Sequence, residues 1–231
     1  MTAKDYGKFG VVGTGKTGAV VKELLGGQAV ECFTRSHRLT FEKVQPLDAL
    51  IVFVPAEGLG ELLPLLLECR KPVVCGTTGF QYSSDFDAEL KKTGMKWITA
   101  SNFSPGMNFM FTMAKLLQAN REFLGEPMVK IHEIHHVHKI DSPSGTAVSL
   151  QKMTGGQTEI RAERVGDHPG FHEITGETGD EKLVLQHHAK NRRAFAEGAI
   201  YAARVLIPDL PVGLHHFETL MTKKILANGE K

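Results

Sequence analysis

The sequence has few cysteines and no sign of an export signal. Its 231 residues include Cys32, Cys69 and Cys75, an odd and sparse set that does not indicate a disulfide framework. The stretch 1–8 lacks the charged and then apolar pattern of a secretory signal. We therefore expect a protein of the reducing cytoplasm.

Strong net charge and long apolar runs are also missing. Lys and Arg number 27 against 26 Asp and Glu, which gives no general reason to expect a nucleic-acid partner. The longest apolar run, Ala49 to Ala56, is far shorter than the ~20 residues that cross a bilayer, so we expect no membrane partner. The 42% hydrophobic and 23% charged residues are typical of a folded globular chain.

Short apolar runs alternate with helix-like stretches in the first part of the chain. This alternation predicts right-handed crossovers and a parallel sheet of the Rossmann type, hence an α/β fold. We place this dinucleotide-binding domain at 1–104 and expect the tail at 209–231 to complete it. The predicted strands are 8–12, 29–33, 49–54 and 72–75.

Three glycines follow the first predicted strand in the pattern Gly-x-Gly-x-x-Gly. Gly13 permits a tight turn, Gly15 lets the backbone approach a pyrophosphate, and Gly18 lets the next helix pack against the strand. The context of strand, glycine turn and helix is the one that this dinucleotide motif requires, although a plain glycine-rich turn is the alternative. The residues expected to bind the cofactor here are Gly13, Thr14, Gly15, Lys16, Thr17 and Gly18.

The end of the second predicted strand indicates which dinucleotide is bound. NAD sites usually carry a carboxylate there for the ribose hydroxyls, but this chain reads Phe33-Thr-Arg-Ser-His-Arg38. The cationic side chain of Arg35 suits a 2′-phosphate, with a solvated basic turn as the alternative. We therefore expect NADPH to be favoured, with NADH possible.

The second part of the chain has the pattern of a different domain. Alternating residues at 128–140 predict a strand, and 171–178 and 182–189 predict a hairpin around Gly179-Asp180. We predict a C-terminal α+β domain at 105–208, with a mostly antiparallel mixed sheet, for substrate binding and oligomerisation.

Chemistry is concentrated between Glu133 and Thr146. If the strand at 128–140 is regular, His135 and Lys139 share one face about 13 Å apart and can grip opposite sides of a small substrate. Histidine exchanges protons near neutral pH, and lysine supplies positive charge or a proton. Glu133 and Asp141 are candidates for orienting these two side chains, or for simple surface and capping roles.

The residues that follow predict an anion site. Ser142 is expected to cap a helix with Pro143 in its first turn, which would present the N–H groups of Gly145 and Thr146 to a carboxylate. A zinc site at His136 and His138 is the alternative, but without a third ligand we expect no metal. An exposed polar strand followed by an ordinary helix cap would explain the same pattern without function.

The stretch His135-His-Val-His-Lys-Ile-Asp-Ser-Pro-Ser-Gly-Thr146 closely resembles the signature of the bacterial dihydrodipicolinate reductase (4-hydroxy-tetrahydrodipicolinate reductase) family. The resemblance extends to Gly76-Thr-Thr-Gly-Phe80, to Ser101-Asn-Phe-Ser104 and to the region from His187 to Ala199. It implies an NAD(P)H-dependent oxidoreductase that reduces a cyclic, unsaturated imine dicarboxylate in diaminopimelate and lysine biosynthesis. It also implies a homotetramer.

The resemblance assigns roles to residues of the motif. His135 matches the proton donor or acceptor, and Lys139 matches a second proton donor. Substrate binding falls on His136, Gly145 and Thr146. Further cofactor contacts fall on Gly76, Thr77, Thr78, Ala100, Ser101, Asn102 and Phe103.

The chain departs from the family pattern at three places. The phosphate loop is one residue shorter, so we expect a different arrangement of phosphate contacts. Val52 and Val54 replace two polar residues of the buried strand, and Thr34 replaces an acidic residue before Arg35. Two rival functions are a dehydrogenase of aspartate or of an amino-acid semialdehyde, and a non-catalytic NADP(H)-binding regulator.

Overall fold

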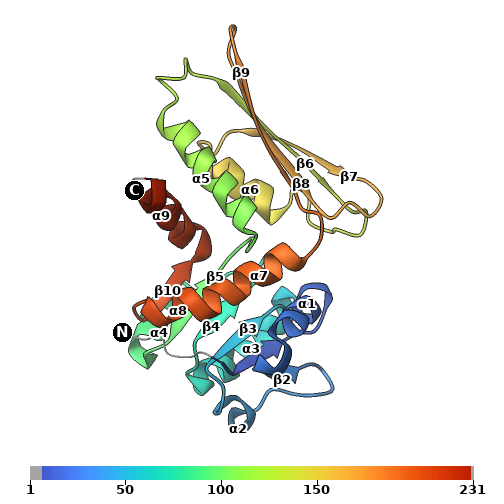
Figure 1. The fold of residues 1–231 in the computed structure, drawn as a ribbon, viewed down its shortest axis with the longest axis vertical. Helices are drawn as coiled ribbons and strands as arrows, with labels where there is room; N and C mark the ends of the chain where they lie inside the picture. Colours follow the sequence, from blue (N-terminus) through green and yellow to red (C-terminus); the bar gives the residue numbers. More distant parts are fainter. Residues whose placement is uncertain (1–6, 230–231) are drawn as a thin grey trace. The chain divides into compact units, whose positions relative to one another are not determined.

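A computed structural model describes residues 7–229, and Figure 1 shows its helices and strands. The chain divides into two compact units. The first comprises the chain up to Ser104 together with Arg192–Leu220, and the second comprises Pro105–Asn191 with the residues from Met221 onward. Most of the stretch 1–8, on which the expectation about export rests, lies outside the described residues. Within them, no helix is both long and apolar enough to span a bilayer.

The first unit is built on a six-stranded parallel sheet, which confirms the predicted Rossmann-type architecture. Its strand order is β10-β5-β4-β3-β1-β2. The strands are β1 (Phe9–Val12), β2 (Ala29–Phe33), β3 (Ala49–Val52), β4 (Val73–Cys75), β5 (Lys96–Thr99) and β10 (Gly213–His216). The helices are α1 (Lys16–Leu25), η1 (Gly26–Gln28), α2 (Phe41–Val44), α3 (Ala56–Cys69), α4 (Phe86–Thr93), α7 (Arg193–Tyr201), η2 (Ala202–Leu206), α8 (Ile207–Asp209) and the first turn of α9 (Phe217–Gly229).

The strand order places a topological switch point beside β1. The chain leaves β1 for β2 on one side and then returns to β3 on the other. Every residue of β1, β3 and β4 is buried, as expected for central parallel strands covered on both faces. In such sheets, ligands bind beyond the carboxyl ends of the strands at the switch point.

Residues 192–208 belong to the first unit, although the sequence analysis placed them in the second domain. Helix α7 packs against α1 in this unit. Gly198 of α7 permits close packing on the segment after β5, because a Cβ there would lie 1.8 Å from the carbonyl oxygen of Phe103. An amphipathic pattern marks a helix but does not say which domain its apolar face covers.

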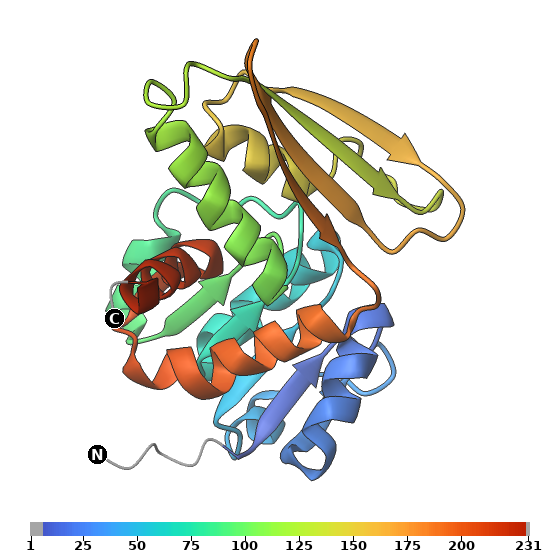
Figure 2. The same ribbon diagram turned by 45° about the horizontal axis from the view of Figure 1, so that its top comes forward.

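The second unit contains a four-stranded mixed sheet of order β7-β6-β8-β9, as the sequence predicts. β6 pairs parallel with β7 and antiparallel with β8, and β8 forms the predicted hairpin with β9. Helices α5 and α6 cover one face of the sheet, as Figure 2 shows. The elements are α5 (Pro105–Ala119), β6 (Met128–His135), α6 (Gly145–Met153), β7 (Glu159–Arg164), β8 (Phe171–Glu177) and β9 (Lys182–His188).

Strand β6 ends at His135, so the prediction of a strand through Ile140 was wrong. The backbone N–H of Val165 donates to the carbonyl of His135, and the chain then turns. Within that turn the N–H of Lys139 donates to the carbonyl of His136. Lys139 therefore lies on a loop, and the separation of 13 Å expected for a regular strand does not apply.

Candidate active site

A hollow of about 950 Å³ lies beyond the carboxyl ends of β1, β2 and β3 in the first unit. This is the switch point of the parallel sheet, the place where folds of this kind bind dinucleotides. The hollow is lined by Val12, Gly13, Thr14, Gly15, Phe33, Thr34, Arg35, Arg38, Leu39, Phe53, Val54, Pro55, Glu57, Gly58, Glu61, Leu62 and Leu65.

The glycine loop has the geometry that its motif requires. Gly13 adopts φ +87°, and a Cβ there would lie 2.3 Å from the carbonyl oxygen of Phe53. Gly18 packs so closely that its Cβ would lie 1.8 Å from the oxygen of Gly13. Gly15 faces open space at the start of α1, where the backbone can approach an anion. Of the six expected residues, Gly13, Thr14 and Gly15 line the hollow; the other three begin α1.

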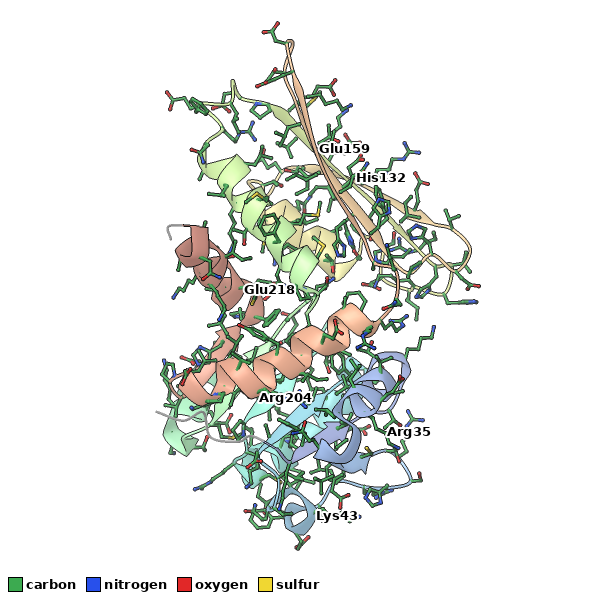
Figure 3. The ribbon with its side chains drawn as sticks, viewed as in Figure 1. Arg35, Lys43, His132, Glu159, Arg204 and Glu218 are labelled. Atoms are coloured by element: carbon green, nitrogen blue, oxygen red, sulfur yellow. The ribbon has the colours of Figure 1, made fainter. Side chains whose placement is uncertain are left out.

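Arg35 lies just beyond the carboxyl end of β2 (Figure 3) and lines the hollow together with Arg38. The turn is held by its own polar groups, since the N–H of His37 donates to Oγ1 of Thr34 over 3.0 Å. Glu57 and Glu61 of α3 also line the hollow, so its charge is mixed.

The two other predicted cofactor segments follow β4 and β5 at the same edge of the sheet. Gly76 fits because a Cβ would lie 2.1 Å from the ring of Phe53. The Thr77 hydroxyl donates to the carbonyl of Val54 over 2.9 Å, and Thr78 is exposed. In the segment 100–103, the N–H and hydroxyl of Ser101 both donate to Glu218 of α9. These contacts fix the loops through backbone groups and hydroxyls.

The valines that replace polar residues of the family pattern have different surroundings. Val52 is completely buried in the core, whereas Val54 lines the hollow. At Val54, an apolar side chain therefore lines the hollow where the family pattern places a polar one.

In the second unit, His135 is the last residue of β6 and faces the sheet surface that α5 and α6 cover. Its side chain is 11% exposed, and its Nδ1 lies 2.6 Å from Oε2 of Glu133, which is completely buried. The other carboxylate oxygen, Oε1, accepts from the N–H of Ser144 over 2.9 Å and from Nη2 of Arg164 over 3.2 Å. Burial would raise the pKa of Glu133, but the hydrogen bonds from His135 and Ser144 lower the pKa to about 2.

Lys139 is anchored on the loop that follows. Its Nζ lies 2.7 Å from Oδ1 of Asp141, and the N–H of Gly145 donates to Oδ2 of Asp141 over 3.3 Å. Burial opposes ionisation of Asp141, but the hydrogen bond and charge of Lys139, together with backbone hydrogen bonds, outweigh burial and lower the pKa of that carboxyl. The guanidinium of Arg164 donates to the carbonyls of Lys139 and Asp141 as well as to Glu133. Arg164 thus ties the lysine loop to the histidine.

Helix α6 begins after Ser144, so the expected cap at Ser142 was wrong. Ser144 Oγ accepts from the N–H of Ala147 over 3.2 Å. The sequence offers one serine on either side of Pro143, and the hydrogen bond that the Ser144 N–H donates to Glu133 is a tertiary contact that the local sequence does not show. Gly145 and Thr146 form the first turn of α6, and Thr146 is buried.

The histidines of the loop and strand offer two possible metal groupings. The rings of His136 and His138 lie 6.3 Å apart. Among residues 7–229, one group of three ligand-type side chains brings its atoms within 4.8 Å of one another: Glu133, His135 and His172. His172 lies on β8, paired with Glu133 across the sheet.

His172 and Arg164 are the site residues that the sequence analysis missed. The Nε2 of His172 lies 3.3 Å from Oγ of Ser144, and its ring packs edge-on against His135 with centroids 5.0 Å apart. Both residues reach the site through strand pairing, because β7 and β8 flank β6. His187, which belongs to the motif region 187–199, lies on β9 and is paired with His172 on β8. Its presence in that motif was a sequence signal that further histidines lie near the site.

Replacing His172 by glutamine will reduce the acid sensitivity of the fold. Burial lowers the pKa of His172 to about 3, whereas an unfolded histidine titrates near 6.5. Between these values the unfolded chain binds the extra proton, so the wild-type free energy of unfolding falls as the pH falls. From pH 7 to pH 5 we expect the wild type to lose about 2 kcal/mol more than His172→Gln, measured by urea unfolding. Equal losses would contradict the assignment of a buried neutral His172.

The fold and the two sites define a class of protein, an oxidoreductase with an NAD(P)-binding fold. Among solved structures, the chain resembles a dipicolinate-bound dihydrodipicolinate reductase from a Paenisporosarcina species, with a TM-score of 0.72 and 19% identity over 92% of this chain and 98% of that one. It also resembles an aspartate semialdehyde dehydrogenase II from Vibrio cholerae, with a TM-score of 0.54 and 12% identity over 87% and 98%. The fold alone therefore does not separate the reductase from its rivals.

The sequence comparisons identify the family. A family model described as dihydrodipicolinate reductase, C-terminus, matches residues 106–221. The chain is 35% identical to a 4-hydroxy-tetrahydrodipicolinate reductase of Bdellovibrio bacteriovorus over 82% of this chain and 83% of that one. It is 31% identical to the Christiangramia forsetii protein of the same name over 85% and 90%. The chain belongs to the 4-hydroxy-tetrahydrodipicolinate reductase family of NAD(P)H-dependent oxidoreductases, as the motif at 135–146 predicted.

Proposed function

We propose that this protein reduces 4-hydroxy-tetrahydrodipicolinate with NADPH, with His135 and Lys139 as its proton-handling residues. One observation carries the proposal. The histidine and the lysine of the family motif are each paired with a carboxylate, and Arg164 joins the two pairs at the start of α6. A site that serves only to bind a cofactor has no need of two anchored proton donors.

The residues of the second unit have distinct tasks in this proposal. His135 exchanges a proton through Nε2, since its Nδ1 faces Glu133. Lys139 brings a positive charge and a proton to the substrate, and Asp141 restrains its ammonium group. His136, Gly145 and Thr146 bind the substrate's carboxylates. The bound cofactor supplies the hydride.

The hollow of the first unit is the proposed cofactor site. Gly15 leaves room for a pyrophosphate, and the predicted cofactor segments all lie beyond the carboxyl ends of parallel strands. Arg35 and Arg38 line the hollow without a carboxylate at the end of β2, which supports the preference for NADPH over NADH.

Arg35→Ala will raise the KM for NADPH by about 10- to 100-fold and will change the KM for NADH by less than threefold. A charged hydrogen bond to phosphate is worth about 1.5–3 kcal/mol, and only NADPH carries the 2′-phosphate. Initial rates with each cofactor measure the effect. Lys22→Ala is the control, because Lys22 is exposed on α1 and does not line the hollow. Equal effects of Arg35→Ala on both cofactors would remove Arg35 from the phosphate site.

The activity itself is tested by oxidation of NADPH at 340 nm with substrate made in place by dihydrodipicolinate synthase. The proposal requires oxidation that depends on the synthase and on its two substrates. Oxidation without the synthase, or none with folded protein that binds NADPH, would favour another dehydrogenase or the regulator.

We further propose a homotetramer that assembles through the sheet of the second unit. The face opposite α5 and α6 carries His132 and Glu159 (Figure 3) and the exposed apolar side chains of Met128 and Val184. A chain of 25.4 kDa would give a tetramer of about 102 kDa by light scattering. A concentration-independent mass of one chain would contradict this proposal.

A cytoplasmic location and the lack of a nucleic-acid partner stay predictions.

A further inference from the structure

One end of the second unit's sheet carries a row of polar residues, of which Glu133 and His172 are buried and His187 is half-buried. On the face toward α5 and α6, Glu133 pairs with His172 on β8, and His172 pairs with His187 on β9. The adjacent row along the same strands is apolar, with Ile131 opposite Ile174. A completely buried carboxylate is destabilising unless charged or hydrogen-bonding partners compensate for its lost hydration. The partners of Glu133 should therefore indicate what the buried carboxylate does.

The partners of Glu133 divide between its two oxygens. Oε1 accepts from Ser144 and Arg164, which are sufficient to keep the carboxylate charged and in place. Oε2 lies 2.6 Å from Nδ1 of His135 and 3.9 Å from Nε2 of His172. A negative carboxylate oxygen this close to Nδ1 of His135 favours a proton on that nitrogen over a lone pair.

The spacing of this contact does not fit a metal site. Two ligands of one tetrahedral zinc ion lie about 3.3 Å apart at metal–ligand distances near 2.0 Å. The 2.6 Å between Glu133 and His135 is shorter, and the guanidinium of Arg164 already occupies the other oxygen of Glu133.

The remaining nitrogen of His135 points to a space that a glycine keeps open. Gly170, at φ +146°, lies before β8, and a Cβ there would lie 3.3 Å from Nε2 of His135. The charged and titratable groups that contact the ring or its carboxylate partner are Glu133, His172 and Arg164. Within residues 7–229, the structure gives one ion-pair contact to a ring nitrogen of His135, the 2.6 Å contact between Nδ1 and Glu133. This contact can therefore select the tautomer that carries its proton on Nδ1.

We propose that Glu133 is a positioning residue that holds His135 in the tautomer protonated at Nδ1, so that Nε2 is the nitrogen that exchanges protons with substrate. This rests on the proposed function for the catalytic role of His135. The tautomer itself is a property of the protein without substrate. A buried carboxylate that orients an imidazole in this way stabilises both its tautomer and its ring angle.

Glu133→Gln tests the proposal, because glutamine keeps the shape but offers both an N–H group and an oxygen. Side-chain ¹⁵N shifts of histidine at pH 8, assigned with His135→Gln, report the tautomer. We expect His135 to be protonated at Nδ1 in the wild type and to become a mixture in Glu133→Gln. In the reductase assay, kcat should fall about 10- to 100-fold while the KM for NADPH stays within twofold. Glu133→Asp should restore part of kcat, since it keeps the charge.

Glu126→Gln is the matched control. Glu126 Oε2 lies 3.1 Å from Nε of Arg121 in the same unit, and the side chain of Glu126 is exposed. The control should leave kcat and the His135 signals unchanged. An unaltered His135 tautomer or an unaltered kcat in a folded Glu133→Gln protein would overturn the proposal, as would stoichiometric zinc that is lost with Glu133. If the wild type lacks reductase activity but shows the predicted tautomer change, the proposed function fails and the orienting contact stands.

Discussion

Lys139→Ala will lower kcat by about 10²- to 10⁴-fold, the contribution typical of a general acid, while the Kd for NADPH stays within twofold. The ammonium group of Lys139 is held on its loop by Asp141 in the second unit, whereas the proposed cofactor hollow is lined by residues of the first unit. Loss of Lys139 therefore removes a proton and a positive charge from the reaction without disturbing the cofactor. Stopped-flow rates and NADPH fluorescence titrations measure the two quantities.

Lys152→Ala is the control for this result. Lys152 is an exposed lysine of α6 in the same unit, and its removal changes the net charge by the same amount. If Lys139→Ala retains more than about a tenth of the wild-type kcat, the lysine is not the proton donor, because general acids contribute at least about 10²-fold.

The second large effect is expected for His135→Gln, with a fall in kcat of about 10²- to 10⁴-fold. Glutamine can keep the contact with Glu133 but cannot exchange a proton near neutral pH, so the fold should be retained and turnover lost. The rate and the urea midpoint are measured together.

His132→Gln provides the comparison, since His132 lies on β6 at the opposite face of the sheet and pairs with Glu163. Its replacement should leave kcat within twofold of the wild type. A loss of activity equal to that of His135→Gln would show that the strand, and not the imidazole of His135, is needed.

The parts of the fold that depend on local chemistry could be predicted from the sequence. The glycine loop after β1 has the conformation that its motif requires, and Gly179-Asp180 lies between two paired strands as expected. The segments predicted to bind the cofactor also lie at one edge of the sheet, since each follows a parallel strand.

The errors arose where tertiary contacts override local pattern. Residues 136–140 alternate like a strand, but in this loop the N–H of Lys139 donates to the carbonyl of His136 and the guanidinium of Arg164 donates to the carbonyl of Lys139. The cap at Ser144 depends on Glu133, eleven residues earlier. Arg164 and His172 could not be identified because strand pairing, and not sequence distance, brings them to β6.

Hydride transfer itself is the central claim, and isotope transfer tests it most directly. The protein would be given NADPH carrying two deuterium atoms at C4 of the nicotinamide, with substrate made by dihydrodipicolinate synthase, and the reduced ring product would be weighed by mass spectrometry. The account predicts a product one mass unit heavier than with ordinary NADPH. A product of unchanged mass, or NADPH oxidation without a reduced ring, would contradict it.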